Sequence, residues 1–217
     1  MISLALSTGL KGVDLDKEYT VWYTLAGDEM TTDEKIMKKA LEAFANKGYE
    51  NIGVQEICDI SGITKPTLYH YFGSKPGLLT QIMTEYSKRL VKTISNASDY
   101  HGDLPLTINK TVKAYFEFAR SNKSFYRLLL NLFFAPPESP FAKICIQYMK
   151  EQFLILEKLF KRASGDHGNM KHKEKRNAIT LLGFINSYIG MWMNGEVELN
   201  DDHVFSASHQ FMHGIYS

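Results

Sequence analysis

The stretch that most constrains the fold of this chain is Gly53–Lys75, which reads GVQEICDISGITKPTLYHYFGSK. Apolar residues at helical spacing predict a first short helix, and they are Val54, Ile57 and Cys58. Gly62 suits the left-handed position that ends many helices, and Thr64 can cap a second helix that tolerates Pro66 in its first turn. Two short helices joined by a tight turn predict a helix-turn-helix, whose second helix enters the DNA major groove. Spacing alone leaves an ordinary helical hairpin as the alternative.

The same stretch, extended to Leu79 (GVQEICDISGITKPTLYHYFGSKPGLL), resembles the signature of the TetR-type (tetracycline-repressor) family of bacterial transcriptional regulators. The TLYHYF run, the following Ser-Lys and the Leu-Leu pair are its most specific parts, and with the preceding helix the match covers about residues 32–90. The resemblance implies an all-α fold of about nine helices. An N-terminal three-helix helix-turn-helix domain would join a C-terminal helical domain for ligand binding and dimerisation. It further implies a homodimeric repressor that acts on a palindromic operator and is released by a ligand.

The resemblance also assigns candidate DNA contacts, which are Gln55, Thr64, Lys65, Pro66, Thr67, Tyr69, His70, Tyr71 and Lys75. Lys65 can donate to guanine acceptors, Gln55 can pair with adenine, and Pro66 or Thr67 can contact a thymine methyl. Tyr69 and Lys75 are expected on phosphates, since a hydroxyl donates a hydrogen bond and an ammonium supplies charge.

Three positions in this stretch are open to another interpretation. Tyr69 can instead be a half-buried packing residue. Tyr71 can lie wholly in the core, because it is predicted to share an inward face with Leu68 and Phe72. Gly53 departs from the family pattern, which commonly has Ser or Thr there, so a side-chain phosphate contact is lost at this position.

Composition bounds the class of protein. The 217 residues are 44% hydrophobic and carry a net charge of +1, from 25 basic and 24 acidic side chains, so DNA affinity must come from local placement of charge. The two cysteines, Cys58 and Cys145, lie on apolar helical faces and are predicted to be core residues in a reducing compartment. No apolar run approaches the roughly 18 residues of a membrane helix, and the N-terminus is a poor signal peptide. We therefore expect a cytoplasmic protein with no membrane partner.

Along the chain, three segments are predicted. Residues 1–29 are an extension of uncertain origin, either foreign to the natural start at Met30 or an N-terminal arm. Residues 30–76 form the helix-turn-helix domain, in which Thr32 is the expected cap of the first helix. Residues 77–217 form the effector-binding and dimerisation domain, with helices expected at about 75–95, 105–121, 125–134, 139–162, 174–193 and 201–215.

The second half of the chain supplies candidate ligand and dimer residues. An aromatic and Met-rich set predicts an apolar or aromatic small-molecule effector, although such residues at helical spacing are more often plain core: Tyr115, Phe118, Phe125, Tyr126, Phe133, Phe134, Tyr148, Met149, Phe153 and Trp192. The resemblance places the dimer interface on the last two long helices. Their apolar residues exceed what one stripe needs, although burial within one protomer is the alternative: Ile185, Tyr188, Ile189, Trp192, Phe205, Phe211 and Met212.

The sequence leaves one alternative to a regulator open and disfavours another. A small-molecule-binding or scaffold protein that keeps the fold but has lost specific DNA binding is the alternative that Gly53 and the neutral charge favour. An enzyme is not expected, because no nucleophile-base pair, paired carboxylates or phosphate loop is visible. His209 and His213 have metal-ligand spacing but lack a third ligand, so neither a metal nor a cofactor is predicted.

Overall fold

The computed structural model describes residues 30–136 and 138–214, where the chain forms nine α-helices, one short 3-10 helix and no strand. The expectation of an all-α chain of about nine helices is confirmed for these residues. The predicted extension, residues 1–29, lies outside them. The elements are α2 (Thr32–Lys47), α3 (Val54–Ser61), α4 (Lys65–Phe72), α5 (Lys75–Ala97), α6 (Leu104–Ser121), α7 (Lys123–Phe133), α8 (Pro140–Asp166), η1 (Gly168–Met170), α9 (Glu174–Met193) and α10 (Asp201–His213).

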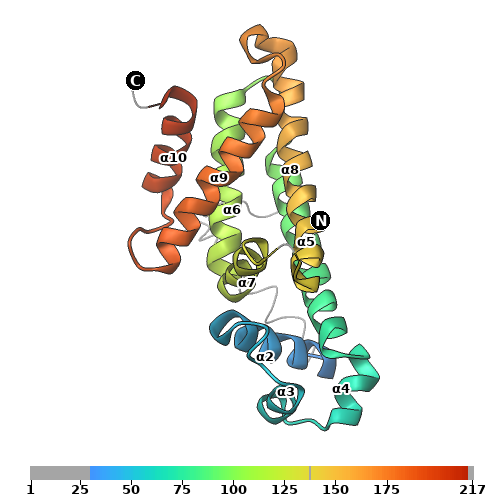
Figure 1. Cartoon of the computed structure of the whole chain (residues 1–217). Helices are drawn as coiled ribbons and strands as arrows, with labels where there is room; N and C mark the ends of the chain where they lie inside the picture. The colour runs from blue at the N-terminus through green and yellow to red at the C-terminus, as the bar shows by residue number, and fades with distance from the viewer. Residues whose placement is uncertain (1–29, 137, 215–217) are drawn as a thin grey trace, which may run out of the picture.

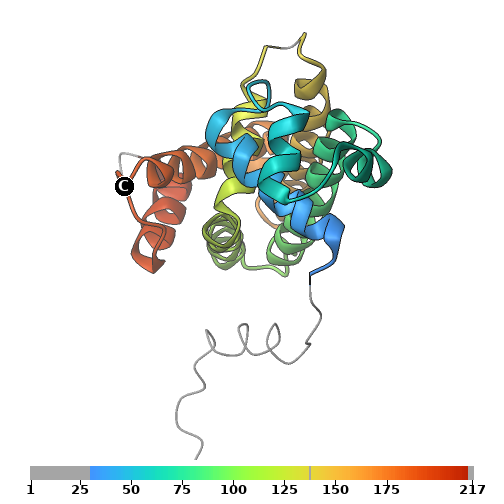
Figure 2. The ribbon, with the colours of Figure 1, turned by 90° about the horizontal axis from the view of Figure 1, so that it is seen from below.

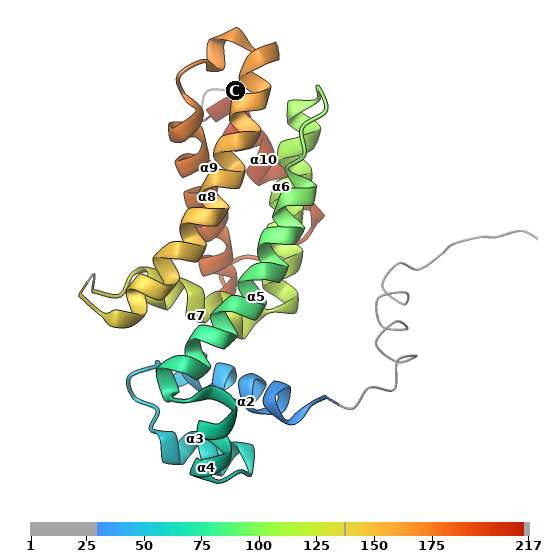
Figure 3. The same ribbon diagram turned by 90° about the vertical axis from the view of Figure 1, so that its right-hand side faces the viewer.

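The helices gather at two ends of an elongated molecule (Figure 1). α2, α3 and α4 form one end, and α6 to α10 form the other. α5 runs from the first end into the second, where it lies beside α8 (Figure 3). One hydrophobic core extends through both ends, from Ile36 on α2 to Ala207 on α10, and α2 packs directly against α7. Within the described residues no helix is both long and apolar enough to cross a membrane.

Local signals set the ends of the helices at the α2–α4 end. α2 is capped by Thr31, one residue before the predicted Thr32, because Thr31 exchanges hydrogen bonds with Glu34 in a capping box. The predicted cap Thr64 is confirmed, and Ser74 caps α5; each accepts a hydrogen bond from a backbone N–H in the first turn of its helix. Gly62 ends α3 at φ 66°, the left-handed conformation that glycine adopts without strain.

The joint between α4 and α5 depends on a residue that the sequence did not single out. The first turn of α5 lies so close to the end of α4 that a Cβ on Gly77 would stand 2.0 Å from the carbonyl oxygen of Phe72. Only glycine fits there without a shift of backbone. The close contact between the backbones of Phe72 and Gly77 therefore fixes the angle between α4 and α5.

Both cysteines are buried and free, as the sequence predicts. Burial raises the pKa of the Cys145 thiol to about 12, so it is a small core residue whose Sγ donates to the carbonyl oxygen of Leu129 at 3.3 Å. Cys58 has the same character, with a pKa raised mainly by burial.

Candidate nucleic-acid interface and ligand pocket

α4 presents the predicted contact residues to solvent. Leu68 and Phe72, four residues apart, are buried and fix the helix against the core. Thr64 caps the helix, and its hydroxyl lies 2.9 Å from that of Thr67. Five predicted contact residues of the second helix are exposed: Lys65, Pro66, Tyr69, His70 and Tyr71. Seen from below, α2, α3 and α4 face the viewer together, so nothing described covers this surface (Figure 2).

The exposure of its side chain settles the open question about Tyr71. Tyr71 was predicted to share the inward face with Leu68 and Phe72, and this is wrong, because its side chain is 43% exposed. On so short a helix only residues 68 and 72 face the core, and Tyr71 is rotated to one side of them. Its ring meets the edge of His70 at 5.4 Å between centroids. Tyr69 is 46% exposed, which excludes a core position and fits both a phosphate contact and half-buried packing.

α3 carries the remaining candidate base contact. Gly53, the N-cap of α3, has no side chain and therefore makes no side-chain capping hydrogen bond. Gln55 is exposed, but its Nε2 donates to Asp59 Oδ1 at 2.8 Å within the same helix. This hydrogen bond uses one of the two amide N–H groups, so the second N–H and the Oε1 acceptor stay available for a base. Glu56, the other acid on α3, is neutralised by Lys47 at 2.6 Å.

Lys75 is the first residue of α5 and occupies an unusual place for a cation. Positive charge at a helix N-terminus is unfavourable by about 0.3–1 kcal/mol, whereas an anion there is favoured. The Lys75 ammonium lies 4.2 Å from the centroid of the Tyr49 ring. Burial lowers the pKa of Lys75, and the Glu50 carboxylate opposes that shift. A phosphate placed at this helix end would meet the ammonium and the backbone N–H of Lys75, since Pro76 has no N–H and the Gly77 N–H donates to Ser74 Oγ.

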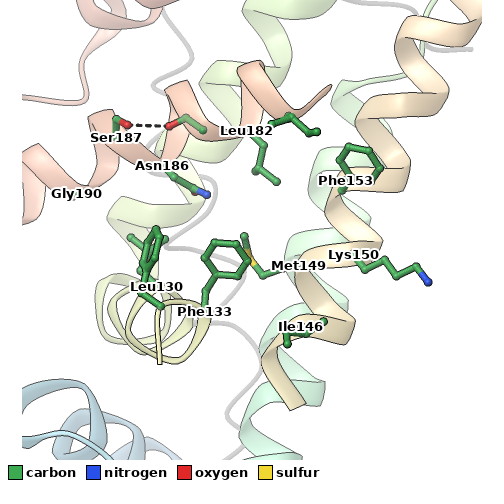
Figure 4. Close-up of a pocket in the computed structure, with 13 residues that line it drawn as sticks. Leu130, Phe133, Ile146, Met149, Lys150, Phe153, Leu182, Asn186, Ser187 and Gly190 are labelled. Carbon is green, nitrogen blue, oxygen red and sulfur yellow. Dashed lines mark hydrogen bonds between the residues drawn. The ribbon is translucent and has the colours of Figure 1, made fainter. Parts of the chain in front are cut away.

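A cavity of about 800 Å³ opens among α7, α8 and α9 (Figure 4). Small residues on α9, Gly183, Ser187 and Gly190, leave the space that larger residues on α7 and α8 surround. The complete lining is Leu130, Phe133, Phe134, Ile146, Met149, Lys150, Phe153, Ile179, Leu182, Gly183, Asn186, Ser187 and Gly190. Phe134 and Ile179 are largely exposed, so the cavity is open on one side.

The polar groups of this cavity are few. Asn186 points into the space between α9 and α8, while Lys150 extends away from it at the edge (Figure 4). The Asn186 carbonyl oxygen accepts from the Tyr126 hydroxyl at 2.7 Å. The Ser187 hydroxyl donates within α9 to the Gly183 carbonyl oxygen. This leaves the Asn186 amide nitrogen as the donor available to a bound molecule.

The predicted ligand set is only partly brought together. Phe133, Phe134, Met149 and Phe153 line the cavity. The other six do not: Tyr115, Phe118, Phe125 and Tyr126 are buried in the core, and Tyr148 and Trp192 have other partners. Tyr148 shares a 2.7 Å hydrogen bond with Thr84, and the Trp192 ring lies under the Lys123 ammonium. The α9 side of the cavity was not predicted from the sequence. The signal that could have indicated it is a set of small residues at helical spacing: Gly183, Ser187 and Gly190.

The predicted dimer set needs a similar correction. Ile185 and Ile189 are fully buried within the protomer, because that stripe of α9 packs on the core. Tyr188, Trp192, Phe211 and Met212 are partly buried against the same core. Phe205 on α10 is 64% exposed and is the member of the set that projects into solvent. Ile179 and Met191 on α9 are exposed apolar residues that the prediction did not include.

The two C-terminal histidines lie close together, with the ring centroids of His209 and His213 4.4 Å apart. Across residues 30–136 and 138–214 no group of three or more His, Cys, Asp or Glu side chains could hold a metal ion.

Comparisons with known proteins cover the N-terminal end by itself and most of the chain. Residues 36–82 match the family described as bacterial regulatory proteins, tetR family. The chain is similar to the HTH-type transcriptional activator FasR of Mycolicibacterium smegmatis, with 25% identity over 192 residues that cover 87% of this chain and 85% of the relative.

Two solved structures share the fold. A transcriptional regulator FadR from Bacillus subtilis in complex with stearoyl-CoA superposes with a TM-score of 0.71 at 17% identity, covering 83% of this chain and 98% of the other. AibR in complex with isovaleryl coenzyme A and operator DNA gives a TM-score of 0.66 at 20% identity, covering 83% and 96%.

Proposed function

This chain belongs to the TetR family of bacterial regulatory proteins, and we propose that it is a homodimeric transcriptional repressor released from its operator by an acyl-chain ligand. The observation that carries the proposal is the surface of α4. A helix capped by Thr64 and fixed by two buried residues exposes Lys65, Pro66 and Tyr69 together. That is the arrangement by which the second helix of a helix-turn-helix contacts base edges and phosphates.

The proposed division of labour follows the chemistry of each side chain. Lys65, Pro66, Thr67 and Gln55 contact bases, while Tyr69 and Lys75 contact phosphates. Thr64, His70 and Tyr71 lie beside them and complete the surface. The domain division proposed is 30–76 for DNA and 77–217 for the ligand and the partner, and the protein acts in the cytoplasm, where its DNA lies.

A second copy of the chain is part of the proposal. One helix-turn-helix makes too few contacts for a specific site, so two copies are expected on half-sites roughly 34–36 Å apart. The exposed apolar residues of α9 and α10, Ile179, Met191 and Phe205, are where we place the partner. Ile185 and Ile189 are excluded from that role by their burial.

The ligand class follows from the cavity and from the two structural neighbours. The space of about 800 Å³ lies within the range of roughly 300–1,000 Å³ that is typical of small-molecule sites. Its walls are apolar, Asn186 offers one donor, and Lys150 supplies a cation at the edge. Because the neighbours were solved with coenzyme A thioesters, we propose an acyl-coenzyme A, with its chain in the cavity and its anionic part outside.

The decisive experiment measures binding of the purified protein to fluorescent DNA from upstream of its own gene, with and without stearoyl-CoA. We expect binding to a short palindrome at low salt and release by the ligand. The absence of any shift at low salt would favour the alternative, a binding or scaffold protein without a DNA site. Deletion of the gene separates the two regulatory signs, since its target rises if the protein represses and falls if it activates, as the name of FasR states for that relative.

A matched pair of variants tests the cavity. A Cβ on Gly183 would meet nothing within 4 Å, so Gly183→Leu fills the cavity without a backbone clash. Gly165→Leu makes the same change on α8, also in open space and away from the lining. We expect the first to weaken stearoyl-CoA binding at least tenfold, measured by calorimetry, and the second to leave it unchanged. Equal behaviour of the two variants would place the ligand elsewhere.

A further inference from the structure

The ring of Tyr49 lies where the two ends of the molecule meet. Tyr49 stands in the turn between α2 and α3 and is 5% exposed. The Phe141 ring, in the first turn of α8, lies 4.1 Å away between centroids at an interplanar angle of 51°. The Phe44 ring of α2 lies at 4.9 Å. A residue of the α2–α4 end is therefore in direct contact with the helix that forms one wall of the cavity.

The same ring holds the cation of Lys75. The ammonium is 4.2 Å from the ring centroid, within the roughly 6 Å of a cation–π contact. A lysine side chain has four rotatable bonds and otherwise samples many positions, so this contact restricts the ammonium to one place beside the N-terminus of α5. An ammonium has three donors, and the ring occupies one side only, so N–H groups stay free for a phosphate.

α8 links this ring to the cavity. Ile146, Met149 and Lys150 line the cavity on the turns of α8 that follow Phe141. Tyr148, on the same stretch, is hydrogen-bonded to Thr84 of α5 at 2.7 Å. Because a helix moves as a stiff unit over two or three turns, a ligand that pushes Met149 outward also moves Phe141. The cavity is thus connected to the Lys75 ammonium by α8, by the contact between the Phe141 and Tyr49 rings, and by the cation–π contact of Tyr49 with Lys75.

We propose that Tyr49 is a positioning residue for DNA binding: its ring fixes the Lys75 ammonium for a phosphate contact, and Phe141 makes that position depend on occupancy of the cavity. The inference rests on the proposed DNA-binding function.

DNA binding at several salt concentrations tests the positioning role. Tyr49→Leu and Lys75→Ala should each weaken binding about three- to tenfold, as expected for one cation–π-positioned charge, and lower the salt slope by about one. The double variant should be no weaker than either single variant. Tyr49→Phe keeps the ring and should bind as the wild type does. A Tyr49→Leu variant that loses thermal stability but keeps the wild-type salt slope would overturn the proposal and leave Tyr49 as core only.

A second measurement needs no variant at the ring. In the wild-type protein the ε-methylene protons of Lys75, assigned by comparison with Lys75→Ala, should resonate upfield because of the ring current. Addition of stearoyl-CoA should return them toward the ordinary lysine position. An ordinary position in the free protein overturns the contact, and an upfield position unchanged by a ligand that releases DNA overturns the coupling. If the wild type shows the upfield signal but binds no DNA, the proposed function fails while the contact stands.

Discussion

The α3–α4 surface and the wall of the α7–α9 cavity both expose side chains that the core does not use, but of opposite kinds. α4 exposes a lysine, a proline, a histidine and two tyrosines around two buried anchors. The cavity exposes phenylalanine, isoleucine and leucine, with Asn186 and Lys150 as its main polar groups. The first surface suits a charged, hydrated polymer and the second an apolar chain. One α-helical chain thus presents two chemically unlike surfaces, which differ in the side chains that the core leaves outside.

The two surfaces also differ in how they are built. α3 and α4 are eight residues each and are held by caps and a close backbone joint. The cavity lies between long helices, α8 of 27 residues and α9 of 20, and depends on how they cross. A change in the joint should therefore disturb mainly the first surface, whereas a change in the helix packing should disturb the second directly and the first only through the contact of Phe141 with Tyr49.

The largest effect is expected from Gly77→Ala. The new Cβ would stand 2.0 Å from the Phe72 carbonyl oxygen, so α4 must shift relative to α5. Overpacking of this kind costs about 1–3 kcal/mol or more, and here it also misplaces the recognition helix. We expect specific DNA binding to fall more than tenfold and the urea midpoint to drop.

Gly183→Ala is the control for that variant, since its Cβ would meet nothing within 4 Å. A glycine inside a helix costs about 0.5–1 kcal/mol relative to alanine, so this change should stabilise the protein. Equal losses of DNA binding in both variants would show that the two surfaces are not built independently.

Much of the first surface could be predicted from the sequence, because its determinants are local. Gly62, Thr64 and Ser74 act on neighbours within a few residues, and each takes the conformation its chemistry favours. Tyr71 was wrongly predicted to face the core, because a helix of eight residues has too few apolar positions to distinguish its inward face from its flank.

The second surface was less predictable, since spacing does not say which stripe of a helix meets which neighbour. Ile185 and Ile189 were assigned to a partner, yet that stripe of α9 packs within the protomer. Gly77 was missed for a related reason. Its requirement for glycine comes from the approach of a carbonyl on another helix, with no positive φ or turn to announce it.

Lys65→Ala tests the proposed base contacts of the α3–α4 surface. Loss of its bidentate or charged contact to a guanine should cost about 1–3 kcal/mol of binding and relax base preference at one operator position. Binding to a set of operators with single base changes measures this. Lys92→Ala, an exposed lysine near the far end of α5, should have no effect. A uniform loss across all operators would make Lys65 a phosphate contact instead.

A pair of buried tyrosines sharpens the comparison at the cavity. Tyr126 donates to Asn186, whereas the Tyr115 hydroxyl is buried without a hydrogen-bond partner in the part of the chain described. Tyr126→Phe should lower the free energy of unfolding by about 1 kcal/mol, and Tyr115→Phe should raise it by a similar amount. Urea unfolding of both variants measures the difference. If both are destabilised alike, the Tyr115 hydroxyl has a hydrogen-bond partner in the core.

The smallest effect is expected at Asp59, the one acid on α3 that no cation neutralises within the described residues. Its carboxylate opposes DNA phosphates and holds the Gln55 amide at 2.8 Å. Asp59→Asn removes the charge but keeps an acceptor oxygen for Gln55, and we expect a gain in DNA affinity of about 0.5 kcal/mol. Asp59→Ala removes both, so it should gain less, because Gln55 loses the hydrogen bond that orients its amide. Titrations at fixed salt compare the two. Identical gains would mean that the hydrogen bond from Gln55 to Asp59 plays no part in DNA binding.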